Sequence, residues 1–430
     1  MRPISRRAFL SRSAAVVGAV GLGGLAAAED GSATPRSTET LAQSGGDAAA
    51  QSYRATQSEL ASLVPFDGVH QAGILTEKPA HATFAALDSF APDRATLAAA
   101  LQALSQRARQ LTIGGALPVL EIDAPPADCG ILGPVNAPDS LTVTIAFGAS
   151  LFDDRYGLAS QRPRELTQMP PFATDQLDPA QTHGDVLLQI CANEPDTVVH
   201  ALRELLRTVR GSLQLRWTID GFQGAARGPT PHSSPRNLFA FRDGTANPVT
   251  SDAATMSKLI WAGAGEPAWA AGGTYQIARI IRMHVEFWDR VGLNEQQNMI
   301  GRVRTTGAPL GGTEEFEDPR YDLDPHGERI PLTAHIRLAN PRTPASADER
   351  FLRRGYNYAR GYDAAGQLDQ GLVFIAFNQS PTRQFVAVQD RLGNEPMIDY
   401  ITPVGGGYFF APPGARGDVD WVGSGLFTAA

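Results

Sequence analysis

Cysteine is scarce in this sequence, with only two among 430 residues, so a fold stapled by disulfides is excluded. Cys129 lies in an expected loop and Cys191 ends an apolar run, which favours two free thiols, although a bridge stays open. Collagen-like and low-complexity composition is also missing, since 43% of the residues are hydrophobic and 19% are charged. This composition is ordinary for a globular protein, and the length predicts two to three domains.

Positive charge is scarce beyond the first dozen residues. The chain has 37 Lys and Arg against 45 Asp and Glu, which gives a formal net charge of -8. No basic run follows the N-terminal segment. Binding to nucleic acid is therefore not expected.

The motifs of several common enzyme classes are absent. The eight histidines form no His-x-x-x-His or His-Glu-x-x-His pair, and no Cys-x-x-Cys occurs, so a structural zinc site or a zincin is not expected. The sequence also contains no Gly-x-Ser-x-Gly and no Gly-x-x-x-x-Gly-Lys-Ser/Thr. These absences argue against an α/β-hydrolase and a P-loop nucleotide site.

The first 28 residues have the pattern of an export signal. Four arginines lie in the first twelve residues, and residues 13–28 are uncharged, rich in small residues and end in three alanines. This stretch is shorter than the roughly 20 apolar residues that a membrane span needs. Ser5–Leu10 resembles the twin-arginine signal of proteins that are exported folded. We expect a periplasmic or secreted protein cleaved near Ala28; an unstructured or membrane-anchored N-terminus is the alternative.

The remaining chain divides into a linker and two expected domains. Residues 29–58 have little apolar content and predict a flexible linker. The proline-rich segment 229–235 suggests a boundary between domains at 59–235 and 236–430. In the first domain, the expected order is strand, helix, strand, strand, helix, strand. Strands are expected at 81–87, 141–147, 185–190 and 213–219, with one helix capped by Asp93 and another capped by Asp196 or Thr197.

This order predicts an α+β domain of the ferredoxin-like type, with an antiparallel sheet and peripheral helices. The second half has expected strands at 276–285 and 371–377. Although the two halves show no sequence repeat, the similar order of elements leads us to expect two ferredoxin-like domains.

Two segments of the second half combine apolar residues with reactive groups. Segment 237–248 places Asp243 between an apolar strand and a loop of small residues that lets the backbone approach a flat ligand. An ordinary Asp-Gly turn is the alternative. Segment 334–342 places His335 between Ala334 and Ile336, where a hydrogen-bonded core histidine is the alternative to a ligand.

Together these segments resemble the dye-decolourising haem peroxidases. Asp243-Gly244 follows an apolar strand, His335 precedes an Arg-x-x-Asn-Pro sequence, and Arg353-Arg354-Gly355-Tyr356 follows them. The resemblance covers most of the chain after the linker and is closest to the twin-arginine-exported subgroup linked to bacterial iron uptake, the deferrochelatases. Further matching blocks occur in the same order at 68–74, 183–192, 286–290, 306–311 and 403–410.

The resemblance implies an exported peroxidase with one haem b per chain, bound in the C-terminal half between sheet and helices. It would use hydrogen peroxide to oxidise phenolic or dye-like donors, and His335 would be the proximal iron ligand. Asp243 would transfer a proton and Arg353 would stabilise charge on the peroxide oxygens. The alternative is a haem-binding protein of iron acquisition with incidental peroxidase activity, acting with iron-uptake machinery. The sequence does not define the oligomeric state, and a homodimer is compatible with it.

The resemblance also assigns supporting residues. Arg337 is expected at a haem propionate, with a structural ion pair as the alternative, and Asp399 is expected to accept a hydrogen bond from His335. Because an aspartate base stays ionised at lower pH than a histidine base, we expect an acidic activity optimum. Residues expected to wall the cofactor are Gly244, Thr245, Ala246 and Asn247.

One residue departs from the family pattern. The signature is Gly-x-x-Asp-Gly, and its first position is Ala240 in this chain. The expectation is that the extra methyl group crowds the backbone near the haem and mildly reduces occupancy or reactivity, since the Asp and the following Gly of the signature are kept.

Overall fold

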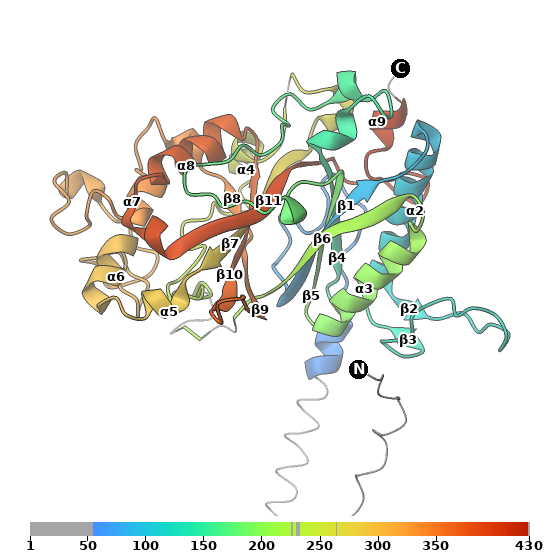
Figure 1. Ribbon diagram of the computed structural model, residues 1–430, viewed down its shortest axis with the longest axis horizontal. Coiled ribbons are helices and arrows are strands. Elements are labelled where there is room, and N and C mark those ends of the chain that lie inside the picture. The colour runs from blue at the N-terminus through green and yellow to red at the C-terminus, as the bar shows by residue number, and fades with distance from the viewer. Residues whose placement is uncertain (1–54, 225–226, 229–232, 264, 429–430) are drawn as a thin grey trace, which may run out of the picture. The chain divides into compact units, whose positions relative to one another are not determined.

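The computed structural model describes residues 55–224, 227–228, 233–263 and 265–428 (Figure 1). The expected signal peptide at 1–28, nearly all of the linker at 29–58 and part of the boundary segment 229–235 lie outside these residues. The domain boundary therefore stays a prediction. Within the described ranges, no helix has the length and apolar character needed to cross a bilayer.

The first half of the described chain forms an antiparallel sheet with two long helices. Its main elements are β1 (His81–Ser89), α2 (Arg94–Ile113), β4 (Thr142–Gly148), β5 (Val186–Ala192), α3 (Pro195–Thr208) and β6 (Leu213–Phe222). The strands lie in the order β4-β5-β1-β6 and all their pairings are antiparallel. This order of strands and helices is the ferredoxin-like one that the sequence predicts. A small hairpin of β2 (Gly115–Ala116) and β3 (Val135–Asn136) lies between α2 and β4.

The two helix starts differ in how well the sequence predicts them. Asp93 caps α2, since its side chain accepts a hydrogen bond of 2.7 Å from the backbone N–H of Thr96. The cap expected for α3 at Asp196 or Thr197 is wrong, because Glu194 is the N-cap residue and the helix begins at Pro195. Proline is favoured at the first helical position, where its missing N–H costs nothing.

The second half repeats the strand order of the first. Its main strands lie in the order β11-β7-β10-β9, and the short β8 pairs with the end of β10. Short helices are inserted between the strands. The strands are β7 (Thr274–Met283), β8 (Leu352–Arg353), β9 (Tyr356–Tyr362), β10 (Leu368–Asn378) and β11 (Ile401–Ala411), and the helices are α4 (Ala253–Leu259), α5 (Val285–Trp288), α6 (Leu293–Ile300), α7 (His335–Ala339), α8 (Ala387–Leu392) and α9 (Ser424–Thr428).

The two half-sheets join edge to edge into one nine-stranded sheet. β11 pairs with β4 through Phe410 and Phe147, and β6 pairs with β9 through Phe222 and Asn357. Because strand side chains alternate between faces, several strands contribute to two cores. In β1, Phe84 belongs to the core between the half-sheets, whereas Ala85 and Leu87 pack in the core beneath α2 and α3.

A third, smaller apolar cluster fills the second half beside β7 and β10. It contains Phe239, Phe241, Met283, Trp288 and Ile300. Phe239 stacks on Trp288 with ring centroids 4.4 Å apart. This cluster anchors the segment that carries Asp243 against the sheet.

Candidate active site

A cavity in the second half brings together most of the residues that the sequence singles out. Asp243, His335 and Arg353 all line it, although they are up to 110 positions apart in the chain. Residues of segment 237–247, β7, α7, β10 and α8 contribute to its wall. Its apolar lining includes Phe239, Phe241, Ile281, Met283, Ile300, Phe351, Phe374, Phe385, Val388 and Met397.

His335 is held by a buried carboxylate. It is the first residue of α7, and its Nδ1 lies 2.7 Å from Oε2 of Glu395. The Glu395 side chain is only 3% exposed, so this bond is shielded from water. A carboxylate that accepts the Nδ1 proton fixes the tautomer and leaves Nε2 as the nitrogen available to a metal.

The prediction that Asp399 accepts the hydrogen bond from His335 is wrong. Asp399 is exposed and does not line the cavity, whereas Glu395 is buried immediately before the short 3₁₀ helix Pro396–Tyr400. The helix start at Pro396 fixes the backbone of Glu395 next to the cavity. The segment therefore contains two carboxylates close in sequence, and the sequence alone does not show which one faces inward.

Asp243 and Arg353 form an ion pair at another part of the wall. Nη2 of Arg353 donates to Oδ1 of Asp243 at 2.6 Å, and both side chains are partly buried. Arg353 belongs to β8, whose register against β10 places it opposite Ala376. The guanidinium carbon lies 5.5 Å from the ring centroid of Phe374, and Nε has no hydrogen-bond partner among the described residues.

The amide of Asn247 connects the two chain segments that carry this pair. Its Nδ2 donates to the backbone carbonyl of Arg353 at 2.8 Å, and its Oδ1 accepts from the backbone N–H of Arg353 at 3.0 Å. The sequence suggests only that Asn247 lines the cofactor site. In the structure, the side chain of Asn247 also fixes Arg353 relative to Asp243 through these two bonds.

The small residues after Asp243 line the cavity as the sequence predicts, but the apolar segment before Asp243 forms a turn and not the expected strand. Gly244, Thr245 and Ala246 all line the cavity, as does Asn247. Gly244 has a φ of +97°, a conformation that residues with a Cβ rarely adopt. Thr245 donates through its hydroxyl to Glu315 at 2.9 Å, which ties the loop to a buried carboxylate that sequence reasoning missed.

The expectation for Ala240 is wrong. Ala240 is exposed and does not line the cavity, so its methyl group does not crowd a ligand there. It lies in a tight turn where its N–H donates to the carbonyl of Asn237 at 2.9 Å. Its φ of +68° is left-handed. A residue with a Cβ is disfavoured at that angle. Ala240, at the first position of the Gly-x-x-Asp-Gly signature, is therefore a strained residue in a turn.

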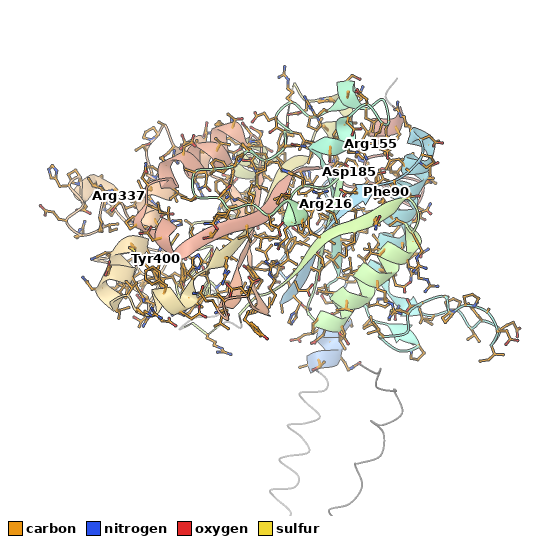
Figure 2. All side chains as sticks on the ribbon, in the orientation of Figure 1. Phe90, Arg155, Asp185, Arg216, Arg337 and Tyr400 are labelled. Carbon is orange, nitrogen blue, oxygen red and sulfur yellow. The ribbon has the colours of Figure 1, made fainter. Side chains whose placement is uncertain are left out.

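Arg337 lies in the structural ion pair that the sequence left as its alternative role. It donates to the carboxylate of Asp324 at 3.2 Å and to the carbonyl of Ile330 at 2.9 Å, and it does not line the cavity. Residues two apart on a helix point in different directions, so the helix that presents His335 directs Arg337 elsewhere. Figure 2 shows Arg337 near the outer end of the second half.

Other arginines line the cavity in its place, namely Arg242, Arg279, Arg302, Arg342, Arg350 and Arg353. The guanidinium of Arg350 has no hydrogen bond or ion pair to any described residue. Burial and the nearby Arg342 lower the pKa of Arg350. Arg279 pairs with Asp175, but its Nε and Nη1 are buried without a partner in the described part of the chain.

Comparison with family models identifies both halves of the chain. Residues 71–223 match the model described as Dyp-type peroxidase, N-terminal, and residues 234–416 match Dyp-type peroxidase, C-terminal. The chain belongs to the Dyp-type peroxidase family.

Curated relatives of this Dyp-type peroxidase include proteins named deferrochelatase. The protein of that name from Escherichia coli K12 is 48% identical over 367 residues, which cover 84% of this chain and 86% of the relative. The Yersinia pestis protein is 45% identical over 377 residues, which cover 87% of each chain.

Solved structures of Dyp-type peroxidases have a fold similar to that of this chain. A DyP-type peroxidase from Cellulomonas bogoriensis is 35% identical with a TM-score of 0.77, and the match covers 86% of this chain and 99% of that one. Ferric DtpA from Streptomyces lividans is 34% identical with a TM-score of 0.76 and the same coverage. The α+β fold, the haem cofactor and the peroxidase class follow from these matches.

The cavity fits haem on its own chemistry. Nδ1 of His335 is engaged by Glu395, which leaves the other ring nitrogen for iron. The apolar lining suits a flat porphyrin, and the cavity has six arginines against the three carboxylates of Asp243, Glu349 and Glu395. Several of these arginines are paired with carboxylates outside the lining, whereas the unpaired guanidinium of Arg350 is left to complement a propionate of haem.

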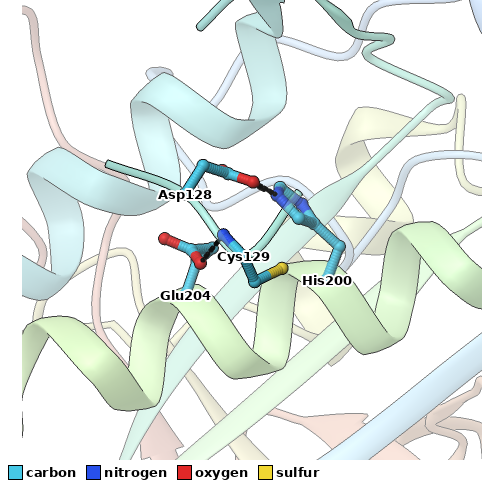
Figure 3. Close-up of side chains that lie close together, drawn as sticks. All are labelled: Asp128, Cys129, His200 and Glu204. Carbon is cyan, nitrogen blue, oxygen red and sulfur yellow. Dashed lines mark hydrogen bonds and ion pairs between the residues drawn. The ribbon is translucent and has the colours of Figure 1, made fainter. Parts of the chain in front are cut away.

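A second cluster of ionisable groups lies in the first half (Figure 3). The ligand atoms of Asp128, Cys129, His200 and Glu204 lie within 4.8 Å of one another. Nη2 of Arg107 lies 3.1 Å from Asp128 and 2.7 Å from Glu204 and compensates both carboxylates. We therefore interpret the cluster as a polar network that links α2, α3 and the loop between β2 and β3. Cys129 and Cys191 are both free, as the sequence predicts.

Proposed function

We propose that this Dyp-type peroxidase is an exported enzyme that reduces hydrogen peroxide with electrons from phenolic or dye-like donors. His335 is the residue that holds the iron, and Asp243 and Arg353 act on the peroxide. The observation that carries the proposal is that the His335–Glu395 pair and the Asp243–Arg353 pair line one cavity. When bound, haem supplies the iron at which the peroxide is reduced.

Asp243 provides a proton relay. Its carboxylate takes a proton from one peroxide oxygen and returns it to the other, directly or through one water, so that the departing oxygen leaves as water. Each phenol then gives up one electron and one proton, and two phenols convert one hydrogen peroxide into two waters.

Arg353 stabilises the negative charge that grows on the oxygens as their bond breaks. Its backbone is fixed by Asn247, and its Nε and remaining donors are not used by described residues. A fixed guanidinium loses less free energy in reorganisation than a mobile one. Glu395 contributes at His335, where it holds the ring orientation and raises the basicity of the ligand.

The test is a stopped-flow measurement of the reaction of the haem-loaded protein with one equivalent of peroxide. Asp243→Asn and Arg353→Leu are expected to slow the change in the Soret band by about 10²–10⁴-fold. Asp418→Asn, at an exposed carboxylate, is the matched control. An unchanged rate in Asp243→Asn would refute its role as the relay, and a rate maximum above neutral pH would count against an aspartate base.

A second candidate function is release of iron from haem, with the peroxidase activity incidental. Its support is the 45% to 49% identity to relatives named deferrochelatase over most of the chain. Incubation of the haem-loaded protein with a ferrous chelator and a reductant, without peroxide, separates the two functions. Fluorescent, iron-free porphyrin that accumulates with unaltered yield in Asp243→Asn and Arg353→Leu supports iron release; its absence argues against it. A partner in iron uptake belongs to this second function.

Export by the twin-arginine route is supported by the sequence of residues 1–28. Folded export suits a protein whose cofactor is inserted before it leaves the cytoplasm. Cells that express the full chain are expected to carry haem protein in the periplasm or medium. The double change of Arg6→Lys and Arg7→Lys should retain it in the cytoplasm, and equal distribution of both proteins would refute the route.

A further inference from the structure

A second, polar cavity lies against the haem cavity. It has a volume of about 480 Å³, which is within the range of small-molecule sites. Asp243, Gly244, Asn247 and Arg353 line both cavities, so the Asp243–Arg353 pair lies where they meet. The first half of the chain also contributes, through the segment from Ile74 to Lys78.

Positive charge dominates this polar cavity. The charged residues that line it are Glu77, Lys78, Arg236, Asp243, Arg353 and Arg354. Asp243 is already paired with Arg353, and Glu77 is exposed. Lys78, Arg236 and Arg354 bind backbone carbonyls and have no carboxylate within ion-pair distance among the described residues. A cavity with three such cations is unusual in a chain whose net charge is -8.

Lys78 is the distinctive residue of the cavity. The chain contains only two lysines, and the other, Lys258, is paired with Asp348 at 2.5 Å on the surface. Nζ of Lys78 donates to the carbonyl of Gly355 at 2.8 Å and lies 5.0 Å from the ring centroid of Tyr356. An ammonium has three N–H donors, so this geometry leaves donors for a ligand.

Arg354 adds an unsatisfied donor of its own. The residue is 6% exposed, and its terminal nitrogens donate to the carbonyls of Thr76 and Glu77. Its Nε is buried without a hydrogen-bond partner among the described residues, as is that of Arg353. The charge of Arg354 has no carboxylate partner among the described residues, so an anion in the cavity that Arg354 lines would be favourable.

The uncharged lining contains polar side chains, among them Gln223, Asn237 and Asn357, and also an apolar part. Ile74, Leu75, Phe222, Leu352 and Leu372 contribute to it. A ligand for this cavity therefore combines an anionic group with an apolar body. A carboxylate on an aromatic ring has both, and its charge-assisted bonds to Lys78 and Arg354 are the strong kind.

We propose that the polar cavity binds small aromatic carboxylates through Lys78 and Arg354, and that phenolic carboxylates are thereby selected as electron donors. The second clause rests on the proposed peroxidase function, whereas binding itself does not. A donor held there lies against Asp243 and Arg353 at the edge of the haem cavity.

The direct test is calorimetric titration of the haem-loaded protein at pH 6.5 with benzoate and with benzamide. These probes have the same shape, and neither is a phenol. We expect benzoate to bind at least about tenfold more tightly than benzamide, the factor of one charge-assisted hydrogen bond. Lys78→Gln should remove this preference, Lys78→Arg should keep it, and Lys258→Gln should not change it. The Soret band of each variant reports that the protein is folded and loaded.

The pH dependence gives a second readout. Burial lowers the pKa of Lys78 to about 8, with Asp243 acting to raise it and Arg354 and Arg353 to lower it. Below that pH Lys78 is charged, so benzoate should bind best there and lose affinity as the pH rises to 9.5. Burial keeps the nearby thiol of Cys191 and phenol of Tyr356 neutral by raising their pKa. Carboxylates and guanidiniums ordinarily keep their charge from pH 6.5 to about 9.5.

The outcomes separate this inference from the proposed function. Equal binding of benzoate and benzamide, or an unchanged benzoate affinity in Lys78→Gln, overturns the site. Binding with the expected preference in a protein that oxidises no phenol with peroxide keeps the site and refutes the peroxidase proposal. If peroxidase activity is present, vanillate should be preferred over vanillyl alcohol in kcat/KM, and Lys78→Gln should reduce this preference; an unchanged preference overturns the selection of donors.

Discussion

The side chain of Asn247 binds both the N–H and the carbonyl of Arg353, at 3.0 and 2.8 Å. One amide thus connects the loop that begins at Asp243 to the edge strand that carries Arg353. The ion pair between Asp243 and Arg353 depends on this connection, because β8 itself has only two residues.

Asn247→Ala removes both bonds, so it should loosen Arg353 without changing the charge of the site. We expect the reaction with peroxide to slow about 10–100-fold, as for other residues that hold a reacting group, and the melting temperature to fall slightly. Stopped-flow kinetics and calorimetry measure the two effects. Asn294→Ala, at an exposed position in α6, is the control. A normal rate in Asn247→Ala would show that β8 holds Arg353 unaided.

Glu395→Gln weakens the acceptor for the Nδ1 proton of His335 and makes the ring a poorer donor to iron. The ferric state should then be less stabilised, so the Fe(III)/Fe(II) potential should rise while activity falls about 10–100-fold. Spectroelectrochemistry of the haem-loaded protein measures the potential. Asp399→Asn changes a neighbouring carboxylate that is exposed and should leave the potential where it is. If the potential shifted in Asp399→Asn and not in Glu395→Gln, Asp399 would be the acceptor, as expected from the sequence.

Ala240→Gly should stabilise the protein, because Ala240 has a φ of +68°. A left-handed residue with a Cβ costs about 1–2 kcal/mol, and the greater freedom of glycine in the unfolded chain cancels roughly 0.4–1 kcal/mol of the gain. The melting temperature at equal haem loading should therefore rise by about a degree. Ala99→Gly, the same change at an exposed position within α2, should lower it. A decrease in both variants would show that the turn is not strained.

Particular residues show which features of the fold and of the site can be predicted from the sequence. Alternating apolar strands and the cap at Asp93 predict the first sheet and α2, because strand period and helix capping are local properties. Asp243, His335 and Arg353 are found through a family resemblance that relates distant segments. The role of Glu395 and the bonds from Asn247 to Arg353 are found only in the structure, since the choice between neighbouring carboxylates and the contact across 106 positions depend on tertiary packing.

Arg350 and Arg337 provide a contrast between haem binding and folding. Arg350 lines the haem cavity without a carboxylate partner in the described structure, and Arg337 is bound to Asp324 away from the cavity. Arg350→Gln should therefore speed haem loss to apomyoglobin by about tenfold, the effect of one lost charge-assisted bond, with little change in the melting temperature of the haem-free protein. Arg337→Gln leaves the partly compensated Asp324 buried, so it should lower that melting temperature by several degrees while haem loss changes less. A side chain that holds haem must affect haem dissociation more than it affects the stability of the haem-free protein. Faster haem loss in Arg337→Gln but not in Arg350→Gln would therefore show that Arg337 binds a propionate, as expected from the sequence.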